Sequence, residues 1–308
     1  MRSGRGGNVA MVRASVPRVV VRSLRLSQII FNAILLAFSF IVLVPIIWAI
    51  SASLKGPKEL YQAIPSLIPM HPTLANYEYM LTKMANFPLY MRNSIIVSFG
   101  TVFLVLLLAS LAGYAFARME FRGRDLIFVL LVMLIFVPRS GGLMALYELM
   151  AFLHLRNSLI GLILLFSAGL SAPIFIMRQT YLSIPRELEE AARIDGATWP
   201  EVFWYLALPL GMAGMVVVAI FTFVQVWGDF LITLTMIDQN RWLTISVGIQ
   251  QLLLTVSPFF AGSSFAGKYA TYGTDAALLL TAAAPVVLLY IFLQRWFVRG
   301  LTEGMLKF

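Results

Sequence analysis

The side chains that could do chemistry gather in one short stretch of the chain. Eight charged residues lie between positions 178 and 201, namely Arg178, Arg186, Glu187, Glu189, Glu190, Arg193, Asp195 and Glu201. The chain has no cysteine, which excludes disulfides and thiolate chemistry, and its two histidines, His71 and His154, are far apart in sequence. Because no nucleophile, metal cluster or carboxylate pair is assembled, an enzyme is the function that the sequence favours least.

The charged stretch belongs to a longer segment, Tyr181–Leu210, whose first part is predicted to be a short helix. Pro185 suits a first helical turn. Leu188, Ala191 and Ala192 recur at i, i+3 and i+4, so one narrow face is apolar and small. Small residues let another surface come close, and the neighbouring carboxylates would give that contact polar edges. An ordinary capped connector between two membrane spans is the alternative interpretation.

A tight turn and a second helix are predicted to follow. Asp195-Gly196 is a helix stop signal, because glycine readily takes the left-handed conformation after a helix. Thr198 and Glu201 have the spacing of a capping box, with a proline in the first turn between them. The second helix is expected to continue to Pro209.

The elements on either side of this segment are predicted to cross a membrane. The 308 residues are 60% hydrophobic and 12% charged, whereas soluble domains are about 25% charged. A spanning helix needs about 20 apolar residues. Six segments meet or approach this length, at roughly 26–50, 93–117, 125–137, 159–177, 211–232 and 274–294. The fold class expected is therefore an all-α membrane protein with six transmembrane helices and no separate soluble domain.

The placement of basic residues predicts the topology. Residues 1–26 carry six arginines and no acid, and form a basic cytoplasmic tail whose extreme N-terminus is expected to be disordered. Residues 27–297 would form the transmembrane domain, and residues 298–308 a cytoplasmic C-terminal tail. The four predicted cytoplasmic segments hold 15 of the 23 Lys and Arg residues, so both termini and the 181–210 segment are placed inside. The net charge of +9 follows these loops, which argues against binding to nucleic acid.

Three connections outside the membrane are predicted on the outer side. Residues 51–91 contain five prolines and several tyrosines, which suits an interfacial, partly structured cap. Residues 143–155 follow the Pro138 interruption and are expected to form a short helix at the outer face. Residues 233–270 are interpreted as a second external loop that ends in a Gly/Ser-rich stretch.

One motif in the charged segment resembles that of a known family. Glu190-Ala191-Ala192, three residues, Gly196, nine residues and then Leu206-Ala207-Leu208-Pro209 closely resemble the EAA loop of ATP-binding-cassette importer permeases. The resemblance implies a type I ABC importer permease fold. It also implies that the residues which couple to an ATPase are Glu190, Ala191, Ala192, Arg193, Asp195, Gly196 and Pro209.

Two further stretches resemble the carbohydrate importers of this family. Residues 93–118, followed by Phe121-Arg122-Gly123-Arg124, are similar to their second span. Residues 294–304 are similar to the tail of the smaller permease of the maltose type. The solute implied is a sugar or oligosaccharide.

The resemblance also implies partners and cofactors. A homologous second permease, two ATPase subunits and an extracellular solute-binding protein would assemble with this chain in the cell membrane. This chain would bind no cofactor itself, and ATP and Mg would bind to the ATPase partner. Closure of the ATPases would switch the pathway between inward- and outward-facing states by alternating access.

A candidate substrate pathway lies near the outer end of the fifth predicted span. The family commonly has Trp-Asn-Asp-Phe there, and this chain has Trp227-Gly228-Asp229-Phe230. Asp229 and Gln225 are candidates for hydrogen bonds to sugar hydroxyls, and Trp227 and Phe230 for packing on a sugar face. The alternative for Asp229 is that it caps a helix end.

Two other functions stay open at this stage. The EAA motif does not separate a sugar importer from an importer of the same class for another solute, such as an amino acid or phosphate ester. A stand-alone secondary transporter predicts acids in the middle of spans and an inverted repeat. The sequence shows no clear acid at such a position, and that function leaves the 181–210 segment without a purpose.

Overall fold

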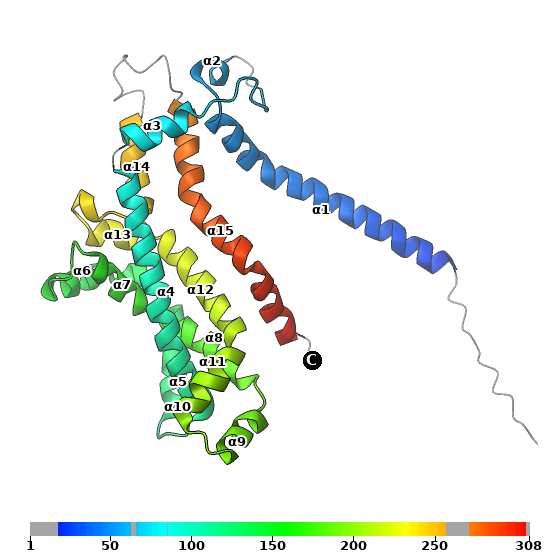
Figure 1. Ribbon diagram of the computed structural model, residues 1–308, viewed down its shortest axis with the longest axis vertical. Helices are drawn as coiled ribbons and strands as arrows, with labels where there is room; N and C mark the ends of the chain where they lie inside the picture. The colour runs from blue at the N-terminus through cyan, green and yellow to red at the C-terminus, as the bar shows by residue number, and fades with distance from the viewer. Residues whose placement is uncertain (1–17, 63–65, 85, 257–270, 306–308) are drawn as a thin grey trace, which may run out of the picture. The chain divides into compact units, whose positions relative to one another are not determined.

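The structure is a computed structural model that describes residues 18–62, 66–84, 86–256 and 271–305. It consists of two units, Met1–Ile50 and Ser51–Phe308. All regular elements in the described ranges are helical (Figure 1). The all-α class predicted from the sequence is therefore confirmed.

The first unit contains most of one long helix, α1 (Arg18–Ser53), with Pro45 inside it. Residues 27–53 of α1 are long and apolar enough to cross a membrane. The helix already begins at Arg18, so the described part of the predicted basic tail, residues 18–26, is helical. The expected disorder of the extreme N-terminus lies outside the described residues.

The second unit is built around one long helix, α4 (Phe87–Arg118). The other helices follow as α2 (Pro57–Leu60), α3 (Ala75–Lys83), α5 (Arg124–Met133), α6 (Leu143–Phe152), α7 (Leu159–Ser167), α8 (Ser171–Leu182), α9 (Arg186–Ile194), α10 (Trp199–Glu201), α11 (Leu208–Leu210), α12 (Met212–Trp227), α13 (Leu231–Met236), α14 (Ile245–Val256) and α15 (Thr271–Met305). Short 3₁₀ turns occupy Leu134–Phe136, Arg139–Gly142 and Asn240–Trp242, and a π-helical turn occupies Val202–Ala207. Helices α7, α8, α12 and α14 pack on α4, while α15 packs on α3, α12 and α14.

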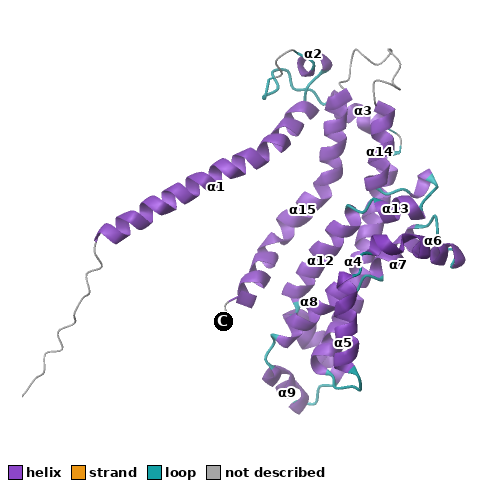
Figure 2. Ribbon diagram, turned by 180° about the vertical axis from the view of Figure 1, so that it is seen from behind, coloured by secondary structure: helices purple, strands orange, loops and turns teal. Residues whose placement is uncertain are grey.

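Within this unit α4 runs the full distance between two ends. Figures 1 and 2 show α3 and α14 at one end and α9 at the other. Two hydrophobic clusters lie along α4: one around Tyr90 and Phe223, the other around Tyr114 and Met177. The same helix therefore supports both ends of the unit.

The number of spans differs from the prediction. In the described ranges three helices are long and apolar enough to cross a membrane, and two bent pairs bring the total to five. These pairs are α7 with α8, bent by 53°, and residues 199–210 with α12, bent by 71°. The predicted third span ends at Phe136, before Pro138. From Arg124 it rises only about 20 Å, short of the roughly 30 Å hydrocarbon core.

The connections that were predicted to lie outside the membrane are more helical than expected. Most of the described part of residues 233–270 is not loop, because α13 and α14 occupy much of it. Ile245, Val247 and Leu252 of α14 are buried, so tertiary packing stabilises a helix that the sequence did not reveal. The Gly/Ser-rich stretch lies outside the described residues. Helix α15 continues to Met305, so the predicted tail after residue 297 is helical as far as that residue.

Residues 51–62 and 66–84 form a structured connection, as expected from the prolines and tyrosines. The carboxylate of Glu59 accepts hydrogen bonds from the backbone N–H of Met70 (2.7 Å) and of His71 (3.2 Å). Asn76 Nδ2 donates to the carbonyls of Ser53 and Lys55, each at 2.9 Å. These bonds replace the regular backbone pairing that the prolines prevent.

The Glu59 carboxylate gives this connection a predictable pH dependence. The Met70 N–H above all, together with the His71 N–H, Ser66 and Lys55, holds the pKa of Glu59 below its ordinary value. A lowered pKa contributes stability above the unfolded-state pKa, and this is lost as pH falls through the folded-state pKa. We expect Glu59→Gln to speed amide exchange over residues 66–76 at neutral pH, and the difference from wild type to shrink in acid. The matched control is Glu78→Gln, an exposed carboxylate on α3, and equal exchange in both variants would contradict the assignment.

Candidate functional site

The EAA loop, Tyr181–Leu210, starts at the end of α8 and contains α9, which ends where the sequence predicts. Gly196 has φ +95°, the left-handed conformation expected from the Asp195-Gly196 stop. The Ala197 N–H donates to the Ala192 carbonyl and the Gly196 N–H to the Arg193 carbonyl, each at 3.0 Å. These two bonds form a Schellman motif, which closes the last turn of α9.

The second helix also begins as predicted but continues differently. The Thr198 N–H donates to the Glu201 carboxylate at 2.7 Å, and the capping box is present. After Glu201 the chain enters a π-helical turn, in which the Leu208 N–H donates to the Phe203 carbonyl. Pro209 follows at once and has no N–H to continue the regular pattern. The capping signals in the sequence predict a helix here but not the wider turn.

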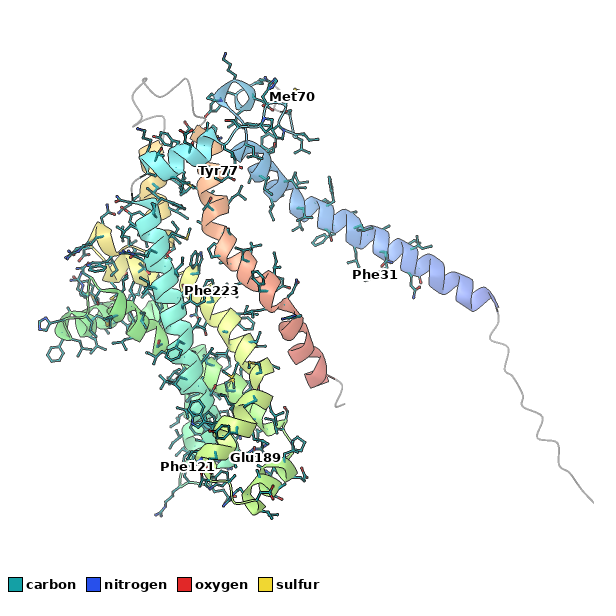
Figure 3. The ribbon with its side chains drawn as sticks, viewed as in Figure 1. Phe31, Met70, Tyr77, Phe121, Glu189 and Phe223 are labelled. Carbon is teal, nitrogen blue, oxygen red and sulfur yellow. The ribbon has the colours of Figure 1, made fainter. Side chains whose placement is uncertain are left out.

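An acidic residue that the sequence analysis did not single out holds α9 in place. Glu189 is buried and accepts a hydrogen bond from Arg118 Nε at 2.8 Å, with only 4% and 7% of the two side chains exposed. Tyr114 donates its hydroxyl to the same carboxylate at 3.2 Å, and Arg118 also donates to the Ile184 carbonyl at 2.6 Å. Figure 3 shows Glu189 at the end of the unit where Phe121 also lies. Spacing alone grouped Glu189 with the exposed carboxylates, because its partners come from α4.

Aromatic side chains pack beneath the buried Arg118–Glu189 pair. The ring of Tyr114 lies 5.5 Å from Tyr181 and 5.2 Å from Phe203, centroid to centroid. These rings come from α4, α8 and the π-helical turn, so three elements near α9 share one cluster. Substitution of either partner of this buried ion pair should lower stability, since removing one partner of a buried pair costs about 3–5 kcal/mol.

The opposite face of α9 is exposed. Leu188 is 45% and Ile194 86% exposed. Glu190 and Ala191 are exposed beside them, and Ala192 is half-buried. The predicted small apolar face is therefore accessible, and the arrangement suits contact with a partner surface.

The structure brings most of the predicted coupling residues together. Glu190, Ala191, Ala192, Arg193, Asp195 and Gly196 all lie on α9 or its terminating turn. The Arg193 guanidinium stacks on Trp199 at 4.4 Å, which ties the two helices of the loop together. Pro209 lies apart from them in α11, beyond the π-helical turn. Their coupling role stays a prediction.

The four candidate pathway residues differ in how far their side chains are buried. Trp227 is buried, stacks on Phe223 at 5.3 Å and donates its indole N–H to the Ala282 carbonyl at 3.0 Å. Its ring is therefore part of the hydrophobic core of the unit, and a role in a substrate pathway stays a prediction. Gln225 and Phe230 are exposed.

Asp229 has the capping contact that was the alternative interpretation. Its Oδ1 accepts a hydrogen bond from the Thr233 N–H at 3.0 Å, in the first turn of α13. The residue is half-buried, so part of it also faces outward. A contact between Asp229 and a sugar stays a prediction.

The fold and the EAA loop define a class of protein: a multi-pass membrane subunit that offers a short capped helix to a partner. No group of three or more His, Cys, Asp or Glu side chains able to hold a metal occurs in the part of the chain that the structure describes. One face of α9, with Leu188, Ala191 and Ile194, is accessible, as a docking surface requires.

Comparison with known proteins identifies the family. The chain belongs to the family described as the binding-protein-dependent transport system inner membrane component, which it matches over residues 106–303. It is 33% identical over 277 residues to an arabinooligosaccharide transport system permease protein of Halalkalibacterium halodurans, covering 87% of this chain and 92% of the relative. It is also 33% identical over 284 residues to a galactooligosaccharide transport system permease protein of Bacillus subtilis, covering 91% and 96%.

A solved structure confirms the fold. A chain of a bacterial ABC transporter involved in import of the acidic polysaccharide alginate superposes with a TM-score of 0.81 at 23% identity, over 90% of this chain and 98% of that one. The type I importer permease fold inferred from the EAA motif is therefore confirmed. The chain is an inner-membrane transport subunit that crosses the membrane several times.

Proposed function

We propose that this chain forms half of the pathway through which an ATP-driven importer takes up an oligosaccharide. A homologous second permease supplies the other half, and an extracellular solute-binding protein delivers the sugar. Two ATPase subunits bind ATP and Mg and receive the exposed face of α9. The observation that carries the proposal is this face, an accessible apolar stripe on a helix anchored from behind by Glu189.

The solute class rests on the relatives. Two permeases that share a third of their residues with this chain are named for oligosaccharide transport. An importer of the same class for a non-sugar solute has no comparable support. A stand-alone secondary transporter is not favoured, because the chain belongs to a binding-protein-dependent family.

The proposed orientation places α9 and both chain termini in the cytoplasm. The support comes from the positions of the basic residues along the sequence. The opposite end of the second unit, with α3 and α14, then faces the outside (Figure 1). This orientation puts the docking helix on the side where ATP is available.

The experiment that tests the proposal is purification of this chain from native membranes, with its co-purifying subunits identified by mass. We expect an ATPase and a second multi-span permease. A co-purifying binding protein is then screened against arabino- and galacto-oligosaccharides. Recovery of the chain alone as a stable homo-oligomer contradicts the proposal and supports a secondary transporter.

Asp229 can be tested separately because its two interpretations respond differently to substitution. Asparagine keeps an oxygen that can accept the Thr233 N–H, whereas alanine removes it. If the carboxylate binds sugar, Asp229→Ala and Asp229→Asn both weaken uptake of labelled arabino- or galacto-oligosaccharides by about tenfold, the effect of a lost charge-assisted hydrogen bond. Assembly with the ATPase stays intact in both. Normal uptake by Asp229→Asn together with poor uptake by Asp229→Ala assigns Asp229 to capping of α13.

A further inference from the structure

Helix α4 is attached by side-chain hydrogen bonds to a different segment at each of its ends. At its outer end Asn93, which is fully buried, donates through Nδ2 to the carbonyls of Arg241 and Leu243, each at 2.9 Å. Ser94 Oγ accepts the Ile245 N–H at 2.7 Å. These bonds fix the segment Arg241–Ile245, which leads into α14, to the side of α4.

The inner end of α4 has an equivalent attachment to α9. Arg118, the last residue of α4, pairs with the buried Glu189, and Tyr114 one turn earlier reaches the same carboxylate. Both attachments are long-range in sequence: 71 residues separate Arg118 from Glu189, and 148 separate Asn93 from Arg241. Neither contact therefore results from closeness of the two residues in the sequence.

The helix between the two attachments is suited to act as one body. It is continuous over 32 residues, and its only proline, Pro88, lies in the first turn, where no kink results. Its length is about 48 Å at the ordinary helical rise, more than the thickness of a membrane core. A displacement of one end therefore reaches the other without an intervening hinge.

We propose that Glu189, Arg118 and Asn93 are positioning residues that join α9, α4 and the segment Arg241–Ile245 into one rigid link. This inference rests on the proposed function, in which α9 docks on the ATPase and the other end of the unit faces the binding protein. A buried, directional ion pair holds α9 in one orientation on α4, and the two carbonyl contacts of Asn93 do the same for the outer segment. Binding at either end then biases the same two-state motion, as linkage between sites requires.

The inner attachment is tested by distance measurement, because the chain has no cysteine of its own. Spin labels are placed at Arg92→Cys on α4 and Glu187→Cys on α9, both exposed positions. The labelled chain is purified within its complex and compared in the nucleotide-free state and after trapping with Mg-ATP and vanadate. We expect one narrow distance distribution that is the same in both states, and a broadened one in Glu189→Gln.

Control variants separate positioning from stability. Asp125→Asn breaks an exposed ion pair with Arg124 at the same end of the unit, and it should behave as wild type. The double variant Arg118→Met with Glu189→Met removes the buried charges together, so thermal stability should recover. We expect the distances in this variant to stay broad. Recovery of both stability and the narrow distribution overturns the positioning role.

The outer attachment is tested by ATP hydrolysis. In reconstituted complexes we expect Asn93→Leu to reduce the stimulation of hydrolysis by the loaded binding protein about fivefold or more, and Glu189→Gln to do the same. Ser98→Ala is the matched control on α4, since its buried hydroxyl has no hydrogen-bond partner. Wild-type stimulation in Asn93→Leu, or unchanged distances in Glu189→Gln, refutes the inference. Failure of the wild-type chain to co-purify with an ATPase refutes the proposed function instead.

Discussion

Proline at position 196 is expected to uncouple transport from ATP hydrolysis while leaving the membrane helices folded. Gly196 has φ +95°, and proline fixes φ near −65°, so the turn after α9 has to change its path. The substitution also removes the N–H that closes the last turn of α9 on Arg193. The exposed face of α9 then no longer meets the ATPase in its proper orientation. The measurement is the ratio of sugar transported to ATP hydrolysed in proteoliposomes, which we expect to fall more than tenfold, consistent with a local cost of about 3 kcal/mol.

Two further substitutions serve as controls for Gly196→Pro. Arg186→Pro adds a proline at the first position of the same helix, where no N–H is needed, and should leave coupling intact. In Gly196→Ala the added Cβ has no neighbouring atom within 4 Å, but an alanine in the left-handed conformation is strained by about 1–2 kcal/mol. This variant should therefore have an intermediate effect. Normal transport by the purified Gly196→Pro complex refutes the coupling role of the EAA loop.

The parts of the site that could be predicted are those with local causes. Gly196 ends α9 because of its own backbone freedom, and Thr198 with Glu201 caps the next helix through neighbours three residues apart. Such signals are contained within one turn of chain. These local signals therefore predicted the end of α9 and the start of the next helix, and the EAA motif predicted the family.

The parts that could not be predicted depend on residues distant in sequence. Glu189 has the same local surroundings as Glu190, and only Arg118 on α4 makes it the buried one of the pair. Helix α14 is stabilised by packing on α4 and α15, which periodicity within residues 233–270 did not reveal. The residue type makes Trp227 a candidate for sugar contact, but only the tertiary structure shows that its indole N–H donates to the Ala282 carbonyl on α15. Each difference reflects a tertiary partner more than 50 residues away in the chain.

The packing of α4 on α8 is expected to fail when Gly113 gains a side chain. Ala109, Gly113 and Ala117 lie four residues apart on the buried face of α4, a small-residue pattern that lets membrane helices approach closely. A Cβ at Gly113 would stand 2.6 Å from Met177 Cβ and 3.0 Å from the backbone N of Arg178. Backbone cannot move aside, so the helices must separate.

We expect Gly113→Ala to lower the free energy of unfolding by about 1–3 kcal/mol, the usual effect of overpacking, and to reduce the yield of assembled complex. The measurement is SDS-induced unfolding of the purified chain in mixed micelles. Gly100→Ala is the matched control on the same helix, because its Cβ would meet the end of the flexible Ile163 side chain at 2.7 Å, which can turn away. Equal stability of the two variants would show that α4 and α8 are not held at backbone contact. Separation of these helices would also displace Tyr114 from Tyr181, so Gly113→Ala should weaken the support beneath Glu189.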